Sequence, residues 1–161
     1  MQIQEVFDRR RFVFLDGGMG TQLQQRGLQP GQKPELAALE MPDVLTAINR
    51  DYTAAGADIL LANTFGATAK KLAGCGRSVE EVVSASIACA RRAGQETSAL
   101  VALDIGPLGE LLAPAGTLAF EDAYEEFAQV IRAGAAAGAD LVFLETMTDL
   151  YELKAAILAA K

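Results

Sequence analysis

Short apolar runs alternate with longer stretches of helical periodicity along the whole chain. The apolar runs lie at 12–15, 59–62, 100–103 and 141–144. Each is apolar at consecutive positions and ends at a turn, which is typical of strands buried on both faces of a parallel sheet. The pattern therefore predicts an α/β chain built from about four β–α units.

The segments between these runs carry apolar residues at three- and four-residue spacing, which predicts amphipathic helices. One helix is predicted to begin near Pro42, because proline suits the first helical turn. Ser78 with Glu81 has the spacing of a capping box at the start of a second helix. Asp149 with Glu152 has the same spacing before the last helix, and a further helix is predicted between them.

The pentapeptide AAGAD occurs twice, at 54–58 and at 136–140. In each copy the glycine is expected to end a helix, where a positive φ is favoured, and the aspartate to begin a strand. We interpret the repeat as loop architecture that recurs because the β–α unit recurs.

Composition narrows the function classes. The 161 residues are 51% hydrophobic and carry a formal net charge of −7 without a basic stripe, which favours a well-packed globular domain and argues against a nucleic-acid partner. No apolar run approaches the roughly 18–20 residues of a membrane span, so no membrane partner is expected. The N-terminal MQIQEVFDRR lacks the apolar region of a secretion signal. We expect a cytoplasmic protein.

Histidine is absent, so the chain offers no histidine-based triad, general base or metal ligand. Cys75 and Cys89 form no CxxC pair and predict no disulfide framework. No residue is assigned as catalytic or as a metal ligand.

Polar residues follow the predicted strands: Asp16, Asn63, Asp104 and Glu145. The carboxyl ends of parallel strands form the edge at which α/β proteins bind ligands. Aspartate and asparagine are also ordinary helix caps and loop formers, whereas glutamate is a poor cap. Glu145 is therefore the strongest functional candidate of the four.

A glycine-rich loop follows Asp16, with the sequence GGMG at 17–20. Its spacing differs from the dinucleotide-binding GxGxxG, so a Rossmann site is only weakly supported. Exposed backbone N–H groups in such a loop can hold a carboxylate, while acids at the same edge can hold an ammonium. Together they favour an amino-acid-like ligand.

Four segments resemble the homocysteine S-methyltransferase family, and within it the homocysteine-binding module of cobalamin-dependent methionine synthases. They are LDGGMGTQLQQRG, AGADILLANTFGAT, DIGPLGELL and GADLVFLETMTDLYELKAAILAAK. The resemblance covers nearly the whole chain in the family's order. It implies a (β/α)8 TIM barrel, of which residues 1–161 would be the N-terminal half, with the remainder of the barrel absent.

The resemblance also implies a substrate site. The positions that match homocysteine contacts of the family are Asp16, Gly17, Gly18, Met19, Asn63, Thr64 and Glu145. The two acids among them match residues that hold the amino group of homocysteine, and the 17–19 backbone matches the segment against its amino-acid end. Asp104 is the weakest match, because the family pattern there centres on the turn at 106–107.

The implied activity is transfer of a methyl group to a zinc-activated homocysteine thiolate, giving methionine. The implied donor is methylcobalamin, with methyltetrahydrofolate as its source, and the loop GELLAPAGT favours that subfamily. The family's zinc cysteines lie in the second half of the barrel, and neither Cys75 nor Cys89 matches them. We therefore expect this chain to carry the amino-acid half of the site and to be inactive alone.

Two other interpretations stay open. The chain could be an inactive half-barrel that serves as a folding or assembly unit, or as a weak amino-acid binder. It could also be an unrelated α/β enzyme such as an aldolase, although no predicted strand ends in the lysine that a Schiff base requires. Since four units cannot close a barrel, the expected partners are homocysteine and either the remaining half of the barrel or a second copy of the chain.

Overall fold

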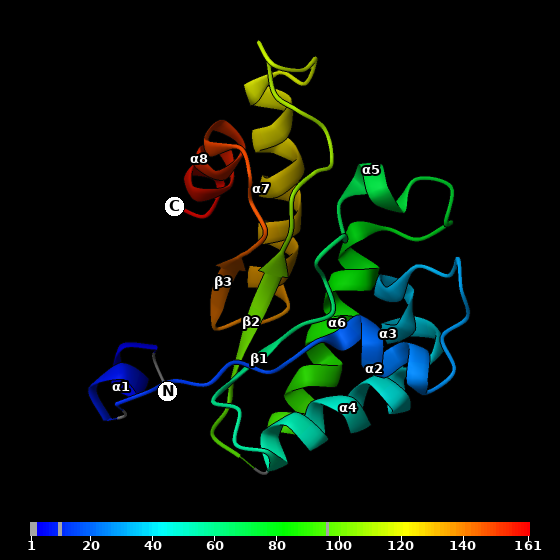
Figure 1. Ribbon diagram of the computed structural model, residues 1–161, viewed down its shortest axis with the longest axis vertical. Helices are drawn as coiled ribbons and strands as arrows, with labels where there is room; N and C mark the ends of the chain where they lie inside the picture. Colours follow the sequence, from blue (N-terminus) through cyan, green and yellow to red (C-terminus); the bar gives the residue numbers. More distant parts are fainter. Residues whose placement is uncertain (1–2, 10, 96) are drawn as a thin grey trace.

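A three-stranded parallel sheet lies at the centre of the computed structural model, which describes residues 3–9, 11–95 and 97–161. Its strands follow the chain in the order β1 (Ile59–Leu61), β2 (Leu100–Ile105) and β3 (Leu141–Leu144). Each strand is separated from the next by a long helix, as the apolar runs predicted (Figure 1). The parallel β–α organisation is thereby confirmed.

The helices that follow the strands are α6 (Val79–Gly94), α7 (Phe120–Ala136) and α8 (Leu150–Ala159). The shorter elements before and between them are α1 (Ile3–Arg9), α2 (Met19–Gln25), the 3-10 turn η1 (Pro34–Leu36), α3 (Ala37–Glu40), α4 (Pro42–Ala54) and α5 (Ala69–Leu72). Helices α2, α3, α4 and α6 gather on one side of the sheet, and α7 and α8 lie beside β3 (Figure 1). No helix among the described residues is long and apolar enough to cross a membrane.

The predicted strand at 12–15 was wrong in extent. Only Leu15 forms a parallel bridge, with Ile59, and the Phe14 carbonyl accepts hydrogen bonds from the backbone N–H groups of Asp58 and Ile59 at 2.8 and 3.2 Å. Phe12 and Phe14 remain mostly exposed, so little burial supports a longer pairing. The segment nevertheless leads the chain along β1 and delivers Asp16 to the carboxyl edge.

Alternate side chains along each strand point to opposite faces of the sheet. Leu60, Val101 and Leu103 pack on the helix face with α6, α7 and α8. Ile59 and Ala102, at alternate positions, belong to a cluster on the opposite face that includes Val6 of α1. The candidate site lies on this opposite face, at the carboxyl ends of the strands.

Both copies of AAGAD have the predicted geometry. Their glycines have φ values of 103° and 85°. The aspartates act alike: Asp58 Oδ2 accepts the N–H of Phe14 at 3.0 Å, and Asp140 Oδ2 accepts the N–H of Val101 at 2.7 Å. Each aspartate therefore ties the start of its strand to the segment beside it, which confirms an architectural role.

Of the three predicted helix starts, two match the structure fully and one matches in part. The helix predicted from Pro42 is α4. Ser78 and Glu81 form the predicted capping box, with side-chain to backbone distances of 3.1 and 2.9 Å. Asp149 caps α8, but Glu152 is buried and accepts the N–H of Leu108 at 2.6 Å instead of completing a box.

We predict that Ser78→Ala lowers the free energy of unfolding by about 1 kcal/mol, because it leaves the first turn of α6 without its side-chain acceptor. Ser84→Ala is the matched control, since Ser84 is exposed inside the same helix, and its effect should stay within about 0.5 kcal/mol. Urea unfolding curves measure both. Equal midpoints for the two variants would contradict the capping role.

Candidate functional site

A cavity of about 480 Å³ opens at the carboxyl ends of the strands. Its lining residues come from the loop before α2, from η1, and from the ends of all three strands: Leu15, Asp16, Gly17, Gly18, Met19, Gly20, Pro34, Glu35, Leu61, Ala62, Asn63, Phe65, Asp104, Phe143 and Glu145. Six of the seven predicted site residues are among them; Thr64 is not. Segments far apart in sequence thus meet at one edge of the sheet.

Strand alternation accounts for the placement of the acids. Asp104 pairs in register with Phe143 across β2 and β3. Because side chains alternate, Asp104 lies on the face of Ala102, and Glu145 lies on the face of Phe143. The backbone N–H of Glu145 donates to the Ile105 carbonyl at 3.1 Å, so the β2–β3 hydrogen bonding continues to this residue.

Asp16 is anchored to β1 by one carboxyl oxygen. Its Oδ2 accepts the N–H of Leu61 at 2.9 Å, while its Oδ1 is buried without a hydrogen-bond partner. Burial raises the pKa of Asp16 to about 7, against the lowering effect of the Leu61 N–H, and the charge of Glu145 adds to the rise. Asp16 therefore titrates near neutrality.

Asp104 is the most enclosed acid of the cavity, with 6% of its surface exposed. Its Oδ1 is also buried without a partner. Burial first, and then the charges of Glu145 and Asp16, raise the pKa of Asp104 to about 8. The sequence had ranked Asp104 as the weakest match, and the structure places it in the centre of the acid cluster.

The glycine loop is held against α4. The Tyr52 hydroxyl donates to the Gly18 carbonyl at 3.2 Å. A Cβ at Gly17 would lie 3.0 Å from the Tyr52 ring, so this close approach favours glycine. Met19 begins α2, and the whole loop lines the cavity.

Asn63 and Thr64 separate although they are neighbours in sequence. The Asn63 amide lines the cavity and donates to the Pro34 carbonyl at 2.6 Å, which fixes η1 at the rim. Thr64 lies outside the cavity lining, with its hydroxyl 2.8 Å from the Asp104 carbonyl and 3.1 Å from the Asp104 N–H. Thr64 thus holds the backbone of Asp104 in place.

Several lining residues were not predicted as site residues from the sequence, among them Phe143, Phe65 and Glu35. Phe143 could have been found from the alternation that also places Glu145. Phe65 packs over Gly106 so closely that a Cβ there would lie 2.4 Å from its ring. Glu35 enters from η1, and only the tertiary fold brings it to the cavity.

The described residues do not fit a zinc site. Cys75 and Cys89 are free, neither lines the cavity, and the Cys89 thiol lies 3.6 Å from the Pro42 carbonyl. Over the described ranges, no group of three or more histidine, cysteine or acidic side chains could hold a metal ion. A catalytic zinc ion requires three protein ligands, from cysteine, histidine or acidic side chains, and keeps a fourth position open.

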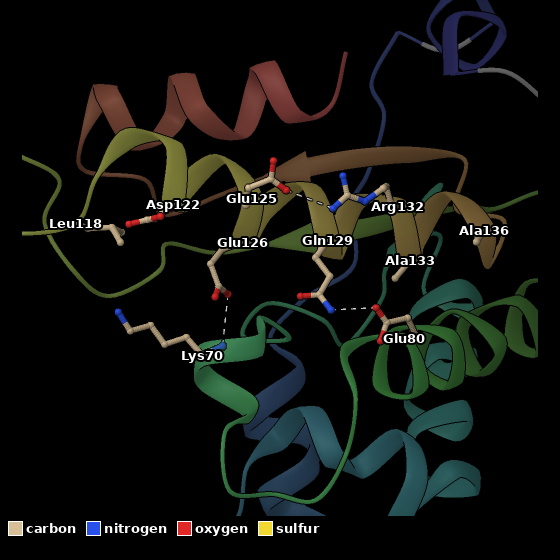
Figure 2. A pocket seen from close by; sticks show the side chains of 10 residues that line it. All are labelled: Lys70, Glu80, Leu118, Asp122, Glu125, Glu126, Gln129, Arg132, Ala133 and Ala136. Carbon is tan, nitrogen blue, oxygen red and sulfur yellow. Dashed lines mark hydrogen bonds and ion pairs between the residues drawn. The ribbon is translucent and has the colours of Figure 1, made fainter.

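A larger hollow of about 920 Å³ lies among α5, α6 and α7 (Figure 2). Several of its polar groups contact each other: Gln129 donates to Glu80 at 3.0 Å, and Arg132 lies 3.5 Å from Glu125. These side chains come from helix surfaces and from no strand end. Its residues form surface contacts between helices, so its size does not make it the site.

Comparison with known proteins agrees on one family. A family model described as homocysteine S-methyltransferase matches residues 13–161. The methionine synthase of Mycobacterium tuberculosis is 34% identical over 170 residues, covering 94% of this chain and 14% of that protein. Homocysteine S-methyltransferase YbgG of Bacillus subtilis is 30% identical over 177 residues, covering 96% of this chain and 56% of that protein.

Solved structures agree on the fold. The metallated form of the homocysteine methyltransferase MmuM from Escherichia coli matches with a TM-score of 0.84 and 24% identity, over 95% of this chain and 60% of that one. The chain has the fold of part of this TIM-barrel protein, which confirms the predicted fold class. It spans between 14% and 60% of the lengths of these three proteins.

We predict that the protein loses stability as pH rises from about 4 to about 8. The folded pKa values of Asp16 and Asp104 are raised, so the folded state holds protons that the unfolded state releases near pH 4. Asp104→Asn should flatten this slope and raise the free energy of unfolding at pH 9 by about 2 kcal/mol. Urea unfolding curves at several pH values measure the free energy of unfolding of both proteins.

The exposed Asp122 of α7 is the control, because Asp122→Asn should leave the slope unchanged. A wild-type stability that stays constant or increases between pH 5 and pH 8 would contradict the burial of uncompensated acids.

Proposed function

We propose that this chain, which belongs to the homocysteine S-methyltransferase family, forms the amino-acid-binding part of a methyltransferase that converts homocysteine to methionine. The observation that carries the proposal is the convergence of Asp16, Asp104 and Glu145 on one cavity at the carboxyl ends of the strands. Three acids at one site repel each other unless a cation joins them. The α-ammonium of an amino acid is such a cation.

The lining residues supply a place for each part of homocysteine. Asp16 and Glu145 would hold the ammonium, and the N–H groups of Gly17 and Gly18 would face the carboxylate. Phe143 offers an apolar wall for the methylene chain. The amino-acid end is thereby fixed, and the thiol is left to project from the cavity.

Thiol activation and methyl donation need groups that the described residues do not provide. Zinc, when bound by the family's cysteines, lowers the pKa of a thiol and stabilises the thiolate. No residue of this cavity is assigned to it, and those ligands are proposed to lie in a further part of the barrel. Methylcobalamin is the proposed donor on the strength of the sequence resemblance alone.

A catalytically inactive half-barrel, serving in assembly or weak amino-acid binding, is the second candidate. It is favoured by apolar side chains of α8 that remain exposed, with Leu150 at 80% and Tyr151 at 61%. Strand β3 also ends the sheet, since it pairs with β2 and with no other described strand. We propose that further β–α units or a second copy of the chain cover this side.

We predict that Glu145→Gln weakens homocysteine binding by about ten- to a hundredfold, because it removes a charged acceptor for the ammonium. Isothermal titration calorimetry measures the dissociation constant. Glu125→Gln, an exposed change on α7, is the control and should bind as the wild type does. An unchanged dissociation constant for Glu145→Gln would contradict the proposed role of Glu145 in binding homocysteine.

We also predict that the 161-residue chain alone dimerises or aggregates, since exposed apolar groups on α8 and the edge of β3 stay uncovered. Size-exclusion chromatography with light scattering measures the mass, and circular dichroism reports folding. A folded monomer at micromolar concentration would argue that this side needs no partner.

A further inference from the structure

Asp104 has one carboxyl oxygen that the fold leaves without a partner. Its backbone N–H and carbonyl are both engaged by the Thr64 hydroxyl, at 3.1 and 2.8 Å. Its carboxyl Oδ1, by contrast, is buried and has no partner. A buried carboxyl oxygen without a partner costs stability, so its position at the end of β2, in the cavity lining, points to a ligand.

The groups that face Asp104 are acids. Glu145 comes from the residue after β3, Asp16 from the loop before α2, and Glu35 lines the same cavity from η1. The Tyr52 hydroxyl, which lies near Asp16, adds no positive charge. None of the described residues that line the cavity is basic. The lining residues therefore supply no positive charge to these acids, whereas a cationic ligand or bound protons would.

We propose that Asp104 is a third substrate-binding carboxyl: it carries a proton in the empty cavity, releases it to solvent when the primary ammonium of the amino acid enters, and then accepts one ammonium N–H. This inference rests on the proposed function and deepens it. A primary ammonium has three N–H donors, and Asp16, Asp104 and Glu145 all line the cavity that would receive it. An N-methylated or deaminated analogue cannot supply all three.

Proton release follows from the charges. Below its folded pKa of about 8, Asp104 is mostly protonated, so an entering ammonium must displace that proton. Affinity for the ammonium ligand should therefore fall as pH falls from about 8, by at most tenfold per pH unit for each proton displaced. Asp16, with a pKa of about 7, contributes a separate step at lower pH.

The test is calorimetry of homocysteine binding at pH 7.5, in two buffers of different ionisation enthalpy, with wild type and Asp104→Asn. A metal chelator is present, so that no metal ionises the ligand thiol and any released proton comes from the protein. The deaminated analogue 4-sulfanylbutanoate is the second ligand. Thr64→Val is the structural control, because it removes the support of the Asp104 backbone and keeps its carboxyl.

We expect the wild type to release protons on binding homocysteine. Asp104→Asn should release fewer, bind homocysteine about tenfold or more weakly, and bind the analogue as the wild type does. Thr64→Val should weaken both ligands alike while still releasing protons.

Proton release that is the same in Asp104→Asn and wild type overturns the inference. It is also overturned if Asp104→Asn weakens the binding of homocysteine and of the deaminated analogue equally. Wild-type binding without proton release also overturns it and leaves the proposed function standing. A wild type that is folded by circular dichroism and binds no homocysteine overturns the proposed function, and the role of Asp104 with it.

Discussion

The register of three parallel strands is the constraint on which the rest of this structure depends. Pairing of Ala102 with Leu141 and of Asp104 with Phe143 sets which side chains face the helices and which face the opposite side. A slip of one residue along β2 would turn Asp104 toward the helices and Leu103 toward the cavity. The apolar packing of Leu103 opposes such a slip, because this side chain is fully buried against α6 and α7.

The same register explains how uncompensated acids are tolerated. Asp16 and Asp104 each keep a buried oxygen without a partner, and burial is the main cause of their raised pKa values. Such groups lower stability, and the large apolar cluster between sheet and helices offsets that cost. The cavity is thus destabilised locally, as binding sites often are, and a cationic ligand would relieve it.

Chemistry, rather than volume, distinguishes the cavity at the strand ends from the larger hollow among the helices. The hollow among α5, α6 and α7 is the larger, but several of its polar groups already contact each other (Figure 2). The smaller cavity gathers acids, a glycine loop and two aromatic rings from segments far apart in sequence. Convergence of unpaired groups at strand ends is what marks a ligand site in an α/β fold.

Much of this architecture was determined by the sequence itself. The spacing of apolar residues, together with the turn and cap residues, predicted the order of β–α units, the start of α4, the capping box at Ser78 and the role of both AAGAD copies. These features depend on residues within a few positions of each other, which is why local patterns predict them. The motifs also identified the family that the comparisons showed.

Only the tertiary structure decided the composition of the cavity. It brought Glu35 and Phe65 to the cavity, placed the Thr64 hydroxyl on the Asp104 backbone, and reduced the segment at 12–15 to a single bridge. Each outcome depends on burial and on hydrogen-bond partners contributed by distant segments. The sequence determined that acids follow the strands, whereas strand register and packing decided which oxygens remain without partners and which face a ligand.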